Sequence, residues 1–419
     1  MRSFSVAAAT GVAVLLSMGR PARPLWLDES VQALTARAPT WSEVVHHHAM
    51  ADMHPPLSMV MDLLTASWLP LEWSARWASL VAYLIAVPLA AWASQQWGAT
   101  HAGRAAWFMS LSPLVWSYGG EGRPYMLGML VGLVVTGKLA TSPASRWPWL
   151  LWLTTLWAAV VPLACALALR QVRLHRSYLV VLPLVPLFWL QWHAQGADLS
   201  GGVLAPWLGL EGDGRSVMRL FGYLATGTGG RMAVIVGTFV GLVMLRCVVE
   251  APRALVRWVV GTTVLFYMAS LWGAYPFGPV RQVLVLLPLW LTVAVVGSDA
   301  WVSTRSWSLG LLVVALAGWW RMPPLPDERL QAAVDALPRG AHVLVEASVA
   351  PQWKVYHHDA WPAATVDEWW RSDALVGPHV TRWLEQPGLR CVLTTRRVDA
   401  LRAGQVTSYG RIQRVCLQH

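Results

Sequence analysis

Residues 77–97 read WASLVAYLIAVPLAAWASQQW, a run that contains no charged side chain. A helix needs about 20 apolar residues to cross the hydrocarbon core of a bilayer, so this run is long enough to span it. Further apolar runs lie at 4–19, 103–119, 124–141, 147–169, 177–192, 232–249, 255–273, 280–298 and 306–320. The pattern predicts a mainly α-helical, polytopic integral-membrane bundle of about ten spans.

The overall composition agrees with a membrane protein. Hydrophobic residues make up 56% of the 419 residues and charged residues only 13%, whereas soluble domains carry about 25% charged residues. The net charge of +10 would suggest nucleic acid as a partner of a soluble protein. Here, however, the basic residues stand at the ends of apolar runs, as they do in membrane proteins. We therefore exclude a soluble multi-domain enzyme and a disordered chain, and we expect contact with membrane lipids and no nucleic acid.

The density of charge changes at Met322. Residues 1–321 hold 33 charged residues, and the much shorter 322–419 hold 21. We therefore predict a membrane domain over 1–321 and a small soluble domain over 322–419.

The soluble domain reads as an α/β module. Residues 341–346, 390–394 and 407–417 are expected to be strands, and 329–338 and 398–403 helices. Cys391 and Cys416 could pair if this domain faces an oxidising space. Cys165 and Cys247 lie in apolar runs and are interpreted as packing residues.

Basic residues in the short loops predict the orientation of the bundle. Those expected to face the cytoplasm are His101, Arg104, Lys138, Arg146, Arg170, Arg173, Arg176, Arg246, Arg253, Arg257 and Arg305. This set is consistent only if 147–169 returns to its starting side, so we expect a re-entrant hairpin bent near Pro162 rather than a single span. The run 4–19 resembles a signal peptide in length, but no clean cleavage site follows it, and we interpret it as an uncleaved span.

Four segments then share the outer face with the C-terminal domain. They are loop 21–76, turn 119–124, loop 193–231 and turn 275–281. Of the 12 acidic residues in the membrane domain, all except Glu250 and Asp299 lie in the outer segments. We therefore expect any chemistry to take place on the outer face.

Asp28 and Glu29 follow an apolar, Trp-containing stretch in the first outer loop. An ionisable pair at the membrane interface is costly unless it is used or paired. A carboxylate there could act as general base on an acceptor hydroxyl or amine. The alternative is a helix N-terminus, with Asp28 as the cap and Glu29 complementing the helix dipole.

Histidines and arginines in the outer segments are the other candidates. His46, His47 and His48 cannot all face one point, so a solvated loop is favoured over a metal site. His54 precedes two prolines, which would hold it in a rigid, extended turn. Glu121 and Arg123 lie in the second outer segment and Arg281 in the last one. An Arg side chain can bind a phosphate with two parallel hydrogen bonds. A structural ion pair, or an Arg side chain that snorkels to the membrane interface, would explain the same positions.

These elements resemble, in order, those of the bacterial protein mannosyltransferase / aminoarabinose transferase superfamily, which are membrane glycosyltransferases of the GT-C type. The resemblance covers about 25–285. It is carried by Trp26-Leu27-Asp28-Glu29, Asp52-Met53-His54-Pro55-Pro56-Leu57, Trp73-Ser74-Ala75-Arg76, Ser112-Pro113 through Glu121-Gly122-Arg123-Pro124-Tyr125, and Tyr275 through Arg281. Two features depart from the family: Ser58-Met59-Val60 stand where some members have a Lys, and three glycines surround Glu121.

The resemblance implies a sugar donor on a polyprenyl phosphate and an inverting transfer without a metal or other cofactor. It implies that Asp28 is the base, supported by Glu29, and that His54, Arg76, Glu121, Arg123, Tyr125 and Arg281 bind substrate. The acceptor would be a lipid, a glycan or a protein, and the site would lie on the periplasmic face of a bacterial inner membrane. The residues leave open a divalent cation at Asp28 and Glu29. They also leave open a transporter or lipid flippase, which would use intramembrane charges as a translocation path.

Overall fold

The computed structural model describes most of the membrane domain and the strands of the C-terminal domain. The described residues are 2–18, 25, 27–51, 54–201, 214–227, 230–272, 277, 281–321, 333, 336, 342–345, 389–394, 405–409 and 412–418. The chain forms two compact units. One contains 1–21 and 41–323, and the other contains 22–40 and 324–419. The proposed boundary between the two functional domains stays a prediction.

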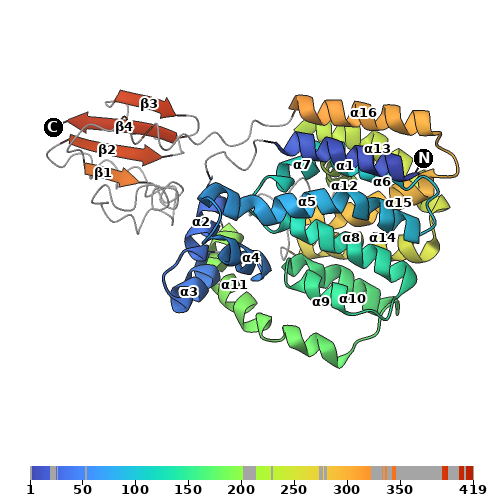
Figure 1. The fold of residues 1–419 in the computed structure, drawn as a ribbon, viewed down its shortest axis with the longest axis horizontal. Helices are drawn as coiled ribbons and strands as arrows, with labels where there is room; N and C mark the ends of the chain where they lie inside the picture. Colours follow the sequence, from blue (N-terminus) through green and yellow to red (C-terminus); the bar gives the residue numbers. More distant parts are fainter. Residues whose placement is uncertain are drawn as a thin grey trace. The chain divides into compact units, whose positions relative to one another are not determined.

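The first unit is a helical bundle (Figure 1). Its helices are α1 (Arg2–Ser17), α3 (Trp41–Ala51), α4 (Leu57–Thr65), α5 (Leu71–Gln96), α6 (Gly103–Leu111), α7 (Pro113–Gly119), α8 (Tyr125–Thr141), α9 (Trp147–Leu153), η1 (Trp157–Ala159), α10 (Val160–Ala168), η2 (Arg176–Val181), α11 (Leu184–Gly201), α12 (Gly214–Thr226), α13 (Gly230–Glu250), α14 (Arg253–Leu271), η4 (Arg281–Leu286), α15 (Leu287–Ser298) and α16 (Thr304–Arg321). The predicted spans fall on these helices. The mainly α, polytopic bundle is therefore confirmed.

Four helical stretches of the described residues are long and apolar enough to cross a membrane: Leu71–Gln96, Ala233–Glu250, Arg253–Leu271 and Arg281–Ser298. Shorter apolar helices lie at Ser5–Ser17, Tyr125–Thr141 and Trp157–Ala168. The centre of the bundle is formed by α5, α8 and α15. Gly137 of α8 shows how close they pack, because a Cβ there would lie 2.3 Å from the ring of Trp92.

Residues 147–169 form a hairpin. Trp149 of α9 and Pro162 of α10 both contact Trp258 of α14: the Trp149 and Trp258 rings lie 6.0 Å apart, and Trp258 Nε1 donates a hydrogen bond to the Pro162 carbonyl at 3.0 Å. The chain therefore turns back on itself within this segment, and its re-entry into the membrane stays a prediction. The bend predicted near Pro162 is wrong. The helix breaks at 154–156, and Pro162 lies in the first turn of α10, where a proline is tolerated.

The prediction of an outer loop over 193–231 is also wrong for much of its length. Here α12 packs antiparallel on α13. A Cβ at Gly222 would lie 1.9 Å from the Ala233 carbonyl oxygen, and one at Gly237 would lie 1.7 Å from the Met218 carbonyl oxygen. Only glycine lets two backbones approach so closely. As a result α12 is a buried part of the bundle and not a solvated connection.

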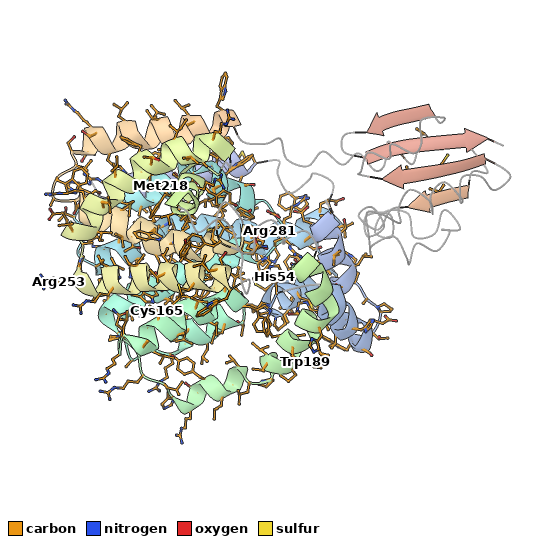
Figure 2. The ribbon with its side chains drawn as sticks, turned by 180° about the vertical axis from the view of Figure 1, so that it is seen from behind. His54, Cys165, Trp189, Met218, Arg253 and Arg281 are labelled. Carbon is orange, nitrogen blue, oxygen red and sulfur yellow. The ribbon has the colours of Figure 1, made fainter. Side chains whose placement is uncertain are left out.

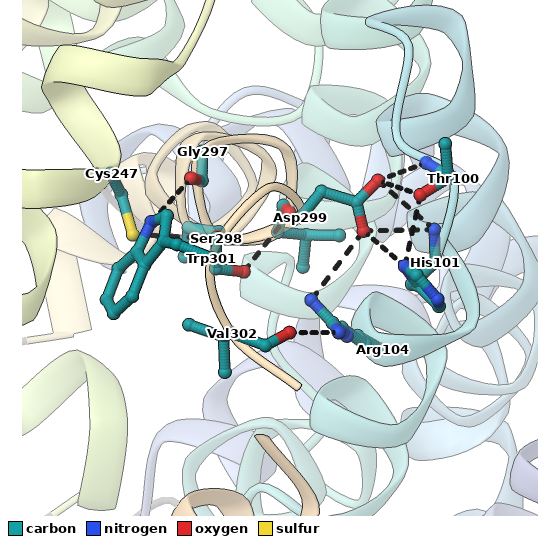
Figure 3. Close-up of polar contacts among 11 residues, drawn as sticks. Thr100, His101, Arg104, Cys247, Gly297, Ser298, Asp299, Trp301 and Val302 are labelled. Carbon is teal, nitrogen blue, oxygen red and sulfur yellow. Dashed lines mark hydrogen bonds and ion pairs between the residues drawn. The ribbon is translucent and has the colours of Figure 1, made fainter. Parts of the chain in front are cut away.

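Two loops meet around Asp299 at the end of α15 (Figure 3). The Asp299 carboxylate accepts hydrogen bonds from the backbone and hydroxyl of Thr100 and from the backbone of His101. It also lies 2.8 Å from His101 Nδ1 and 3.6 Å from Arg104 Nη1. Arg104 Nη2 donates in turn to the Val302 carbonyl at 2.7 Å. Two loops that were both predicted to face the cytoplasm thus lie together.

Neutralising Asp299 is expected to destabilise the protein in a pH-dependent way. Burial alone would raise the pKa of Asp299, but the hydrogen bonds from Thr100 and His101 outweigh burial and hold the pKa below its ordinary value. A depressed carboxyl pKa stabilises the fold above the unfolded-state value of about 3.9, and the contribution is lost as pH falls through the folded-state value. We expect Asp299→Asn to lower the thermal midpoint in detergent by about 2–4 °C at pH 7. The difference from wild type should shrink below about pH 4, and a difference that is the same at pH 7 and pH 3 would contradict this account.

The second unit contains α2 (Leu27–Ala36), β1 (His342–Val345), β2 (Leu389–Thr394), β3 (Gln405–Tyr409) and β4 (Ile412–Gln418). The strands form a sheet in the order β1-β2-β4-β3, in which β1 and β2 are parallel and the other pairs antiparallel. The first two predicted strands are confirmed. The single strand predicted over 407–417 is wrong, because these residues belong to a β3–β4 hairpin with Tyr409 opposite Ile412.

Other predictions for this unit have mixed outcomes. The helices predicted at 329–338 and 398–403 lie outside the described residues, apart from Ala333 and Ala336. Cys391 is disulfide-bonded, and Cys416 lies directly opposite it in the β2–β4 ladder. Cys165 and Cys247 are free and buried, in agreement with a packing role.

Candidate functional site

Three aromatic rings form a row at one end of the bundle. The His54 and Tyr125 rings meet edge to face, with centroids 5.2 Å apart and planes at 87°. Tyr125 meets Tyr118 in the same way at 5.4 Å and 70°. His54 and Tyr125 are buried, with 7% and 4% of their surface exposed. Residues 54 and 125 were predicted only to share the outer face, and the structure brings them into contact.

Arg281 lies on this row from a distant part of the sequence. Its guanidinium carbon is 5.6 Å from the centre of the Tyr125 ring, and its Nη1 is 4.0 Å from Glu121 Oε1. Figure 2 shows His54 and Arg281 at the same end of the bundle, with Arg253 at the opposite end. The cluster of His54, Tyr118, Glu121, Tyr125 and Arg281 is called the outer cluster below.

The chain around His54 is fixed by hydrogen bonds to its backbone. Gln191 Nε2 of α11 donates to the His54 carbonyl at 3.0 Å and to the His48 carbonyl at 3.3 Å. Trp157 Nε1, beside the hairpin turn, donates to Gln191 Oε1 at 3.0 Å. The prolines after His54 add rigidity, since they fix the backbone φ angle. The imidazole is therefore presented by a segment braced from α11 and the hairpin.

The turn that carries Glu121 and Arg123 is anchored to α5. Ser79 Oγ donates to the Arg123 carbonyl at 2.8 Å, and the Arg123 N–H donates to the Glu121 carbonyl at 2.8 Å. Gly119 begins this turn against Tyr83, where a Cβ would lie 2.7 Å from the ring. Glycine here therefore permits a close approach to α5, and the turn is held firmly despite its glycines.

The three arginines of the predicted site differ in exposure. Arg76 on α5 is fully buried and Arg123 is 7% exposed. The side chain of Arg281 is 32% exposed. Because it is the most exposed of the three, Arg281 is the cation most accessible to an incoming anion. Its Nη1 lies 4.0 Å from Glu121 Oε1, at the long end of an ion pair.

The predicted acid pair lies in the other compact unit. Helix α2 begins at Leu27, which places Asp28 and Glu29 in its first turn. A carboxylate at this position is stabilised by the helix dipole. Asp28 is therefore not the N-cap. Glu29 is fully buried, whereas the side chain of Asp28 lies outside the described residues. The catalytic roles of this pair stay predictions.

Several polar residues near the site were missed from the sequence. Tyr118 and Tyr223 are joined by a hydrogen bond of 3.1 Å between their hydroxyls. Asp62 is 2% exposed and lies on the buried face of α4 with Ser58 and Thr65. A carboxylate inside an apolar helical stretch was a signal that could have identified Asp62.

A solvated loop was predicted for the histidine run 46–48, and this prediction is wrong. It belongs to α3, where His46 is exposed and His48 is 3% exposed. In the part of the chain that the structure describes, no three His, Cys, Asp or Glu side chains converge on a point that could hold a metal ion.

Comparison with solved structures identifies the fold. The chain is similar to the crystal structure of ArnT from Cupriavidus metallidurans bound to undecaprenyl phosphate, with a TM-score of 0.58 and 13% sequence identity over 99% of this chain and 97% of that one. The apo crystal structure of the same protein gives a TM-score of 0.54 and 13% identity over 98% and 97%. Neither a protein-family model nor a curated protein matches the sequence. The likeness establishes the fold, which is of the GT-C type expected from the ordered motifs.

Proposed function

We propose that this protein is an integral-membrane glycosyltransferase that moves a sugar from a polyprenyl-phosphate carrier to a lipid, glycan or protein acceptor. The observation that carries the proposal is the outer cluster, in which an accessible arginine lies between Glu121 and Tyr125 at one end of a GT-C-type bundle. The structure of ArnT with undecaprenyl phosphate supports a lipid phosphate as the partner of this fold.

The proposed reaction inverts the anomeric carbon. An acceptor hydroxyl attacks that carbon, the bond from the carbon to the phosphate oxygen breaks, and the polyprenyl phosphate leaves with the electron pair. Asp28 takes the acceptor proton, with Glu29 in support. Arg281, with Arg123, stabilises the negative charge that grows on the phosphate.

The remaining predicted residues hold this arrangement in place. His54 and Tyr125 line the site, and the Tyr125 ring supports the guanidinium of Arg281. Glu121 limits the rotation of Arg281 through its charge. Arg76 lies one helical turn before Ser79, whose hydroxyl anchors the Arg123 backbone.

We place the site on the periplasmic face of a bacterial inner membrane. The disulfide at Cys391 favours an oxidising compartment for the C-terminal domain. Arg104 and Arg253 lie in the first turns of α6 and α14, next to loops that the positive-inside rule assigns to the cytoplasm. Figure 2 places Arg253 at the end of the bundle away from the outer cluster.

Sugar transfer in proteoliposomes tests the proposal. The purified protein would receive a panel of radiolabelled polyprenyl-phosphate sugars together with lipid and envelope acceptors. We expect label to leave one donor and appear in one acceptor class. If no donor is turned over, the transferase is contradicted and the transporter or flippase gains support.

An apolar cleft suits the hydrocarbon tail of the donor. It has a volume of about 280 Å³ and lies between α6, α12, α13, α15 and α16. Its lining includes Leu287, Trp290 and Leu291, which continue the helical stretch that Arg281 begins. A phosphate held at Arg281 would therefore leave its tail within reach of the cleft.

Gly310 allows this cleft to be filled without disturbing the fold. It lines the cleft, and a Cβ there would meet no described atom within 4 Å. We expect Gly310→Phe to raise the KM of a long-chain donor about 10-fold, since the tail loses burial worth about 0.8 kcal/mol per CH2 group. A short-chain donor should be unaffected, because its tail ends before the cleft.

Gly11→Phe on α1 is the matched control, because a Cβ at Gly11 also meets open space but lies outside the cleft. Equal KM values of Gly310→Phe and wild type for the long-chain donor would rule out this cleft as the tail site.

A further inference from the structure

A pair of tyrosines connects α12 to the outer cluster. Tyr118 ends the row of rings that starts at His54, and its hydroxyl lies 3.1 Å from that of Tyr223. Tyr223 is 7% exposed and comes from the segment that the sequence had suggested was a loop. Both phenols are also within electrostatic reach of Glu121 and Arg281.

The contacts form a series that starts at Tyr223 on α12 and ends at the guanidinium of Arg281. The Tyr118–Tyr223 hydrogen bond fixes the rotation of the Tyr118 ring. The Tyr118 edge packs on Tyr125, and Tyr125 carries Arg281 at 5.6 Å from its ring centre. Each ring therefore restricts the next, because edge-to-face pairs have preferred geometries.

This series of contacts starts on α12, a helix that is tightly packed. α12 packs closely on α13, because Gly222 and Gly237 bring the two backbones into direct contact. Tyr223 therefore stands on a closely packed helix. Arg281 has a long, rotatable side chain, so its position depends on what packs around it.

We propose that Tyr118 and Tyr223 are positioning residues that hold Arg281, through Tyr125, in the orientation that the departing phosphate requires. The inference rests on the proposed function. Neither hydroxyl needs to touch the substrate. The pair acts by keeping the guanidinium aligned when negative charge develops on the phosphate, which is the moment at which orientation matters most.

Removing either hydroxyl should slow the chemical step. Tyr223→Phe and Tyr118→Phe each keep the ring and break the same hydrogen bond. We expect each to lower kcat about 10-fold with little change in the KM for the donor, since small misplacements of a catalytic group are costly. The double variant Tyr118→Phe/Tyr223→Phe should lose no more than either single variant, because only one interaction is removed.

Testing Tyr223→Phe in a second genetic background distinguishes a positioning role from a general effect on protein stability. In Arg281→Lys, which lacks the planar guanidinium, Tyr223→Phe should cause no further loss of kcat. Tyr178→Phe is the control for the chemical change, because among the described residues its buried hydroxyl has no hydrogen-bond partner. Thermal midpoints of all variants would be measured in parallel.

The outcomes distinguish this inference from the proposed function. If wild type transfers no sugar, the proposed function fails. If wild type is active and Tyr223→Phe keeps the wild-type kcat, the positioning role is overturned. It is also overturned if the loss in Tyr223→Phe is the same in the Arg281→Lys background as in wild type.

Discussion

Replacing Asp28 with Asn is expected to abolish sugar transfer while the protein still accumulates in the membrane. Asn has nearly the size and shape of Asp but cannot accept a proton at neutral pH. Loss of a general base lowers turnover roughly 100- to 10,000-fold. The measurement is transfer from the polyprenyl-phosphate donor in proteoliposomes at saturating acceptor, together with the thermal midpoint in detergent.

The same substitution separates the two interpretations of Asp28. If Asp28 only complements the dipole of α2, its charge is worth about 0.3–1 kcal/mol of helix stability, and turnover would not change. If Asp28 is the base, turnover is lost although stability changes little. Asp28→Glu should restore some activity, because it keeps a carboxylate but shifts its position.

Glu43→Gln is the matched control for Asp28→Asn. Glu43 lies in the same predicted outer loop, in the first turn of α3, and is exposed. It should retain wild-type transfer. Full activity of Asp28→Asn would remove Asp28 from the mechanism, and activity lost equally in Glu43→Gln would point to a general effect of charge in this loop.

The outer cluster could be predicted largely from topology. Glu121 and Arg281 are far apart in the sequence, but each was predicted at the outer end of an apolar run, and runs that cross one bilayer bring such ends together. The same reasoning placed His54 and Tyr125 on one face, and the structure brings their rings into contact. What topology could not provide is the order of contacts, because the rotation of each helix depends on its packing partners.

The failures have identifiable physical causes. Residues 214–226 carry two arginines and glycines and do not form a long apolar run, so they resembled a loop. In fact Gly222 is a contact point with α13, and Tyr223 and Thr226 are buried. The β3–β4 hairpin was missed, although Gly410 between the two strands was a signal for it. Glycine is typical of the turn in a hairpin. Proline 162 was assigned to the bend because an early helical proline and a loop proline look alike in sequence.

Removing the side chain of Arg281 is expected to lower kcat nearly as much as removing the proposed base, Asp28. We expect Arg281→Ala to lower kcat roughly 100- to 1,000-fold, the range found when one donor that stabilises a developing anion is deleted. Arg281→Lys should recover only part of the loss, because an ammonium cannot form two parallel hydrogen bonds to a phosphate or stack flat on the Tyr125 ring. Initial rates over a range of donor concentrations give kcat and KM separately.

A second variant distinguishes phosphate binding from a simple charge imbalance at the site. Arg281→Ala removes the cation 4.0 Å from the Glu121 carboxylate, and Glu121 is only 8% exposed. A buried carboxylate that loses a cationic neighbour is costly and could distort the turn. If that were the cause, Glu121→Gln in the Arg281→Ala background would restore transfer. If Arg281 contacts the leaving phosphate, the double variant stays inactive, because no neutral residue replaces the missing donor. Recovery in the double variant would make Arg281 a structural partner of Glu121 and would move the phosphate site toward Arg123.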